Sequence, residues 1–236
     1  MRELRKHHCV FLFANLLSIL IVYPYLYKQQ ILLNTIFTAI LFTSLYAIAI
    51  NKIQFLIGLL FGLPWLAATI MQIFIAEYFH QEISLGLRIF SNVISIVFMA
   101  YISISLLLYI VRAPVVDKDV IFAAISLFIL IGIAWGALYA IVELLYPGSY
   151  HLASPMPLMD GRFEWYHFLY FSFVTIATLG YGDITPLTPQ AQSLVILEAM
   201  TGLFYIALLV SRLVGVYAPQ PSPNNANNSN DSNPGI

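Results

Sequence analysis

Charged residues are scarce in this chain. Only 9% of its 236 residues are Asp, Glu, Lys or Arg, whereas soluble domains carry about 25%. Because 61% of the residues are hydrophobic, the chain cannot cover a water-facing surface, and the bilayer must serve as its solvent. The formal net charge of −1 gives no basis for nucleic-acid binding. The single cysteine, Cys9, excludes an internal disulfide.

The side-chain groupings of enzymes and metalloproteins are also missing. The polar residues form no nucleophile, metal-ligand or acid–base constellation, and His7 and His8 lie in a short basic segment suited to the membrane surface. We therefore expect no enzymatic activity, no cofactor and no resident metal ion.

The chain instead has six apolar segments long enough to span a bilayer, since a transmembrane helix needs about 20 residues. They lie at 9–27, 31–50, 53–76, 85–111, 120–145 and 191–216. Seven of the ten Lys and Arg residues flank the ends that lie on the same side as the N terminus. By the positive-inside rule, we expect a multi-pass protein of a plasma or bacterial inner membrane with both termini in the cytoplasm.

A glycine-containing loop separates the fifth and sixth segments. It reads Thr178-Leu179-Gly180-Tyr181-Gly182-Asp183. A desolvated cation needs oxygen ligands in place of water, and four copies of an extended loop can supply them from backbone carbonyls. Carbonyls that all point inward require backbone angles that alternate in hand, and glycine enters the left-handed region without a Cβ clash. Thr178 can add a hydroxyl oxygen, and Tyr181 can brace the loop.

This run resembles the signature of the tetrameric potassium channel superfamily, with Leu179 where Val or Ile is commoner. The resemblance covers about residues 120–216. It implies an all-α membrane protein with a re-entrant pore helix at about 163–177. It also implies that potassium is coordinated by Thr178, Leu179, Gly180, Tyr181 and Gly182, with Asp183 at the outer mouth. The chain carries one such motif, so four copies are needed for one filter.

Further pore residues follow from the same resemblance. Tyr170 and Phe171 lie where the family often has an aromatic pair around the filter, and Val174 lies where some members have a buried acid. Glu143 resembles an outer-end glutamate that braces the filter region, although an ordinary interfacial acid is an equal alternative. A small-residue stripe at positions 132, 136 and 140 is expected to pack against the sixth helix.

The sixth segment carries the expected gate. Gly202 follows Asp183 by 19 positions (202 − 183), the distance at which the family places a hinge glycine, although a packing glycine is the alternative. Helical steps of three and four place four apolar residues on one face, which we assign to the pore. They are Leu203, Ile206, Val210 and Val214.

Glu198 is the one acid deep within a predicted span. It precedes Leu203 by five positions, which at about 100° per residue places it roughly 140° from the pore-facing line. We expect it to face the pore helix, where Ser172 and Thr175 offer hydroxyls, and to support the filter as a neutral carboxyl, since burial disfavours charge. The alternative is a polar clamp without a role in gating.

Four helices before a two-helix pore resemble voltage-gated potassium channels in layout. Voltage sensors carry Arg or Lys at every third position of the fourth helix, whereas segment 85–111 contains only Arg88. The chain is predicted to divide into a cytoplasmic N terminus (1–8), a scaffold without gating charges (9–113), a pore domain (114–216) and a disordered cytoplasmic tail (217–236).

The predicted function is passive, potassium-selective conduction by a homotetramer with little intrinsic voltage sensitivity. Its partners would be further copies of the chain and membrane lipids, with no nucleic acid and no soluble regulatory domain in the chain. The alternatives are a non-selective cation channel and the pore subunit of a potassium uptake system.

Overall fold

The computed structural model describes residues 8–26, 52–79, 85–113, 115–153 and 163–217. The predicted span at 31–50 lies outside these residues, as do most of the N-terminal segment and the tail. The described elements are α1 (His8–Leu26), α3 (Lys52–Phe79), α4 (Leu85–Arg112), α5 (Lys118–Leu145), β1 (Tyr150–Leu152), α6 (Trp165–Ile176), β2 (Ile184–Pro186) and α7 (Pro189–Tyr217). The five long helices begin and end within three residues of the predicted spans.

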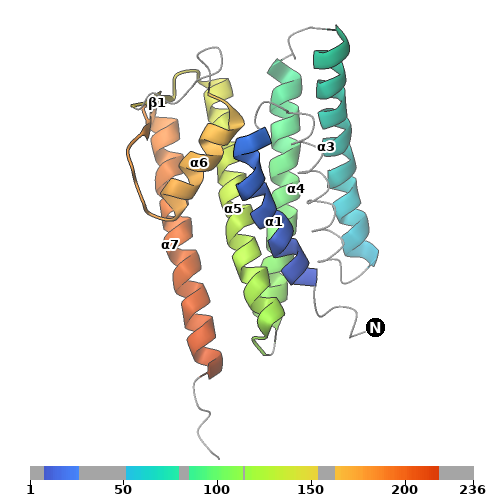
Figure 1. Cartoon of the computed structure of the whole chain (residues 1–236), viewed down its shortest axis with the longest axis vertical. Helices are drawn as coiled ribbons and strands as arrows, with labels where there is room; N and C mark the ends of the chain where they lie inside the picture. The colour runs from blue at the N-terminus through green and yellow to red at the C-terminus, as the bar shows by residue number, and fades with distance from the viewer. Residues whose placement is uncertain (1–7, 27–51, 80–84, 114, 154–162, 218–236) are drawn as a thin grey trace, which may run out of the picture.

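Three helices in the described part of the chain are long and apolar enough to cross a membrane, namely Leu85–Arg112, Lys118–Leu145 and Pro189–Arg212. α1 and α3 contribute shorter apolar stretches, Cys9–Tyr25 and Leu56–Gln72. Figure 1 shows that α1, α3 and α5 run in one direction and α4 and α7 in the other. The start of α1 and the end of α7 therefore lie at the same end of the bundle.

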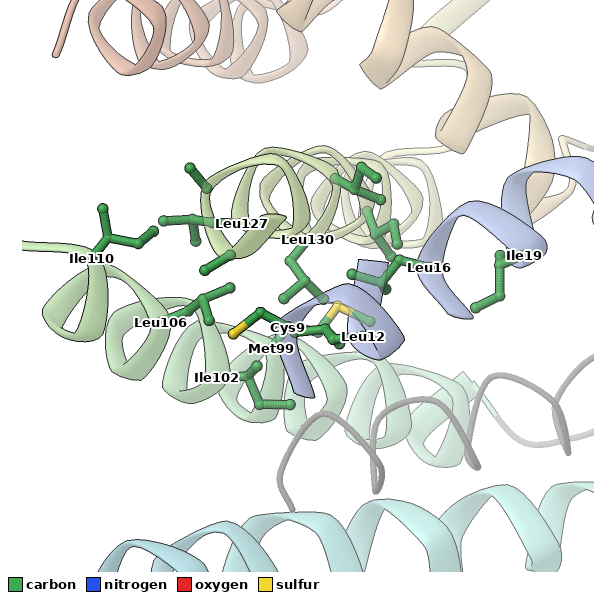
Figure 2. Close-up of a cluster of buried hydrophobic side chains, with 14 of the residues drawn as sticks. Cys9, Leu12, Leu16, Ile19, Met99, Ile102, Leu106, Ile110, Leu127 and Leu130 are labelled. Carbon is green, nitrogen blue, oxygen red and sulfur yellow. The ribbon is translucent and has the colours of Figure 1, made fainter. Parts of the chain in front are cut away.

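The main core lies where α1, α4 and α5 meet (Figure 2). α5 contacts α1, α4, α6 and α7, and α3 packs on the outer side of α4. The residues shown there include Leu12 and Leu16 of α1, Ile102 and Leu106 of α4, and Leu130 of α5. Because lipid tails are as apolar as leucine, dense van der Waals packing holds such helices together. This core crosses the boundary predicted between residues 113 and 114.

The small-residue stripe of α5 contacts α6, and the prediction that it packs on the sixth helix is wrong for both of its glycines. A Cβ on Gly136 would lie 3.2 Å from the backbone of Leu169, and one on Gly132 would lie 2.9 Å from the ring of Phe173. The stripe thus lets the short helix α6 approach the backbone of α5. This contact positions the loop that follows α6.

Candidate pore loop

Helix α6 begins with a reciprocal cap. Glu164 is the N-cap residue, its side chain accepts from the backbone N–H of His167, and the Glu164 N–H donates to His167 Nδ1 over 3.0 Å. Such a box satisfies two amide donors that the helix leaves unpaired. Sequence reasoning missed this cap, because the side chain of the buried His167 replaces the usual Glu or Gln of the motif.

In the loop after α6, residues with a positive φ angle alternate with residues without one. The φ angles of Thr178, Gly180 and Gly182 are 58°, 57° and 76°, so every second residue is left-handed. No heavy atom lies within 4 Å of a Cβ built on Gly180 or Gly182. The need for glycine therefore comes from the backbone angle and not from crowding within the chain. Thr178 is β-branched, so its left-handed conformation costs about 1–3 kcal/mol.

The end of α6 holds the start of this loop. The carbonyl oxygen of Val174 accepts from Leu179 N at 2.9 Å and from Gly180 N at 3.4 Å. The carbonyl oxygen of Thr175 accepts from Thr178 N at 2.9 Å. Any displacement of α6 along its axis would therefore move the loop with it.

The side of the loop that does not contact α6 is exposed. Residues 177–182 are all exposed, with Leu179 54% and Tyr181 65% exposed. In the described part of one chain, nothing covers this strip of backbone and side chains. One chain thus presents the loop as an uncovered surface.

The C-terminal end of the loop is connected to α6 through Asp183. Tyr170 Oη donates to Asp183 Oδ2 over 2.6 Å, and Ile184 N donates to Asp183 Oδ1 over 3.0 Å. The loop exit is thereby fixed from two sides.

A small antiparallel sheet continues from Asp183. β2 pairs with β1, with His151 opposite Thr185. Glu143, near the end of α5, accepts from Gly148 N and Ser149 N, each over 2.9 Å, and so holds the turn before β1. These hydrogen bonds thus link Glu143 to the loop through the sheet.

Tyr170 and Phe171 face different surroundings. Phe171 packs against Tyr139 and Tyr150 with ring centroids 5.1 and 5.7 Å away. Consecutive helical residues differ by about 100°, so the two rings predicted as a pair have separate partners. Phe171 belongs to an aromatic cluster behind α6 that comprises Tyr139, Tyr150, Phe163, Phe168 and Phe171.

Glu198 is 0% exposed and lies between α5, α6 and α7. Its Oε1 atom lies 2.5 Å from Ser172 Oγ, the contact predicted from helical phase. The second hydroxyl comes from Tyr139, which contacts Oε2, and not from Thr175. Tyr139 precedes Glu198 by 59 residues, so no helical pattern could indicate this contact. The predicted role of Glu198 in supporting the filter remains a proposal.

Helix α7 continues through Gly202 without interruption, and Gly202 is buried against the end of α6. Leu203, Ile206 and Val210 are exposed in the single chain, and the side chain of Val214 lies outside the described residues. Two polar contacts tie the lower half of α7 to its neighbours. Tyr205 Oη donates to Ala124 O over 2.5 Å, and Arg212 Nη2 donates to Ala113 O over 2.6 Å.

Residues 127–218, less than half of the chain, match a protein-family model described as "Ion channel". A 46-residue stretch is 46% identical to a rice protein (Oryza sativa subsp. japonica) named "Two pore potassium channel c". This match covers 20% of the chain and only 10% of the rice protein. No solved structure matches the chain. These similarities support a membrane protein of the ion-channel superfamily, of the potassium-channel kind.

Proposed function

We propose that the chain is one subunit of a homotetrameric channel that conducts potassium passively and selectively. The observation that carries this proposal is the alternating backbone hand at Thr178, Gly180 and Gly182. That alternation is what a row of inward carbonyls requires, and the match of residues 127–218 to an ion-channel family model agrees with it. Potassium is the permeant ion in this proposal, and no resident cofactor is needed.

Exposure of the loop favours assembly around a central axis. Residues 177–182 and most residues of α7 between positions 189 and 212 are exposed in one chain. Four copies would close the oxygen cage and bury these surfaces. The C-terminal end of each α6 would then direct its negative dipole end towards the cavity below the filter, which favours a cation.

The re-entrant layout is supported by the length of α6. Its 12 residues reach about 18 Å at 1.5 Å per residue, which is less than the hydrocarbon thickness of about 30 Å. We place six spans in the membrane and both termini in the cytoplasm. The shared end of α1 and α7 agrees with that orientation (Figure 1).

Two other functions differ in selectivity and assembly. A non-selective cation channel would pass sodium as readily as potassium. The pore subunit of an uptake system would need further filter loops, whereas this chain has one intact Gly-Tyr-Gly motif. The selective channel therefore accounts best for the loop.

The test is a bilayer recording. Purified protein is placed in planar bilayers with potassium on one side and sodium on the other. The reversal potential should follow the potassium gradient, with little sodium current. Equal permeability to the two ions would overturn the proposed selectivity.

A further inference from the structure

Three short oxygen–oxygen contacts form a line behind the pore loop. The hydroxyl of Tyr139 meets Glu198 Oε2, Glu198 Oε1 lies 2.5 Å from Ser172 Oγ, and Ser172 Oγ lies 2.6 Å from the carbonyl oxygen of Gly132. The side chains of Tyr139, Ser172 and Glu198 are all 0% exposed. The contact between Tyr139 and Glu198 joins α5 to α7. The contacts of Ser172 join α6 to α7 on one side and to α5 on the other.

The hydrogens available to this line can be counted. Each of the three contacts needs one hydrogen between its two oxygens. Tyr139 and Ser172 bring one hydrogen each, and the carbonyl of Gly132 brings none. The third hydrogen must therefore be on Glu198. Because the Gly132 oxygen can only accept, the direction follows: Tyr139 donates to Glu198, Glu198 to Ser172, and Ser172 to Gly132.

An ionised Glu198 would leave one contact without a hydrogen. Ser172 would have to choose between the carboxylate and the Gly132 oxygen, and the other pair of oxygens would repel each other at 2.5 or 2.6 Å. In the described part of the chain, the carboxyl group is bound only by the two hydroxyls. A buried charge without a cationic partner is strongly disfavoured.

We propose that Glu198 is uncharged and acts as a hydrogen-bond donor to Ser172, in a relay that positions α6 beneath the filter. Ser172 lies two residues before Val174, whose carbonyl oxygen accepts from Leu179 N and Gly180 N. The relay therefore positions the end of α6, which in turn forms the hydrogen bonds to the loop. Tyr139, Ser172 and Glu198 are positioning residues, and their effect on conduction rests on the proposed function.

Infrared difference spectroscopy of the full-length protein in lipid tests the protonation state without requiring conduction. Subtraction of the Glu198→Gln spectrum from the wild-type spectrum at neutral pH should leave the carbonyl stretch of a protonated carboxylic acid. Asp117→Asn is the matched control, because Asp117 is an exposed N-cap and Asn caps a helix equally well. That control should remove only carboxylate bands. Loss of carboxylate bands in Glu198→Gln would overturn the proposal.

Current recordings then distinguish an effect of hydrogen-bond donation by Glu198 from an effect of its charge. Glutamine can donate to Ser172 through its amide N–H and accept from Tyr139 through its oxygen, so Glu198→Gln should keep wild-type current, inactivation and tetramer stability. Glu198→Ala and Ser172→Ala should inactivate several-fold faster. If Gln is as impaired as Ala, Glu198 acts through its charge and the relay is refuted. If the acid band is present but conduction is non-selective, the relay stands and the channel proposal fails.

Discussion

Gly202 of α7 and the carbonyl oxygen of Ile176 at the end of α6 are in such close contact that a Cβ on Gly202 would lie 2.3 Å from that oxygen. A backbone atom cannot move aside as the end of a flexible side chain can. Glycine at this position is therefore required by the close approach of α7 to the end of α6, whether or not the helix also bends there. The packing alternative alone accounts for the residue.

Gly202→Ala should lower the thermal midpoint of tetramer dissociation, because the added methyl group forces α6 and α7 apart at a cost of about 1–3 kcal/mol. Gel or light-scattering assays of heated tetramers measure this. Gly86→Ala on α4 is the control, since nothing lies within 4 Å of its built Cβ, and it should not lower the midpoint. A Gly202→Ala tetramer of unchanged stability but reduced open probability would favour a hinge instead.

Gly180→Ala should abolish potassium current. The φ angle of 57° at this residue is one that a Cβ disfavours, and loss of the alternation would turn a carbonyl away from the ion. Gly148→Ala is the control, because Gly148 is also left-handed, with φ of 83°, but lies in the turn before β1. It should retain potassium selectivity. Normal conduction by Gly180→Ala would contradict the filter geometry.

Tyr170→Phe should destabilise the end of the loop at Asp183, which is the proposed outer mouth of the channel. It removes the donor to Asp183 Oδ2, a hydrogen bond to a charged group of the kind that contributes about 1.5–3 kcal/mol when buried and less here, where the pair is half-exposed. The expected result is faster current decay under sustained activation. Tyr146→Phe, at an exposed site after α5, should decay at the wild-type rate. Equal decay rates in both variants would remove Tyr170 from the filter support.

Val210→Asn and Val214→Asn should raise resting conductance if the apolar face of α7 closes by dewetting, a known form of channel gate. Leu208→Asn is a suitable control, because two positions place it roughly 160° from Val210 on the helix and its side chain is exposed. It should leave resting conductance unchanged. Unaltered open probability in both valine variants would place the gate elsewhere, at the filter itself.

Open probability should change only weakly between about −100 and +100 mV, because moving each elementary charge across the field contributes about 2.3 kcal/mol per 100 mV. Arg88 and Arg112 are the only charged residues of α4, and they lie towards opposite ends of it. Steady-state recordings over this range measure the dependence. A steep conductance–voltage curve would require gating charges outside α4.

Much of the architecture follows from the sequence alone. Lipid offers no hydrogen bonds, so each spanning segment must satisfy its own backbone, and long apolar runs indicate helices directly. The bounds of α1, α3, α4, α5 and α7 follow from those runs to within three residues. The glycine spacing at 180 and 182 likewise indicates left-handed positions, because the requirement is local to each residue.

Contacts between distant segments were decided only by the tertiary structure. The sequence placed Ser172 near Glu198 by helical phase, but Tyr139 reaches the same carboxyl from α5. The stripe of Gly132 and Gly136 was assigned to the wrong neighbour, because small residues permit close approach without specifying which helix approaches. The left-handed Thr178 runs against its own local preference. Its conformation depends on the backbone contacts that the end of α6 imposes on the loop.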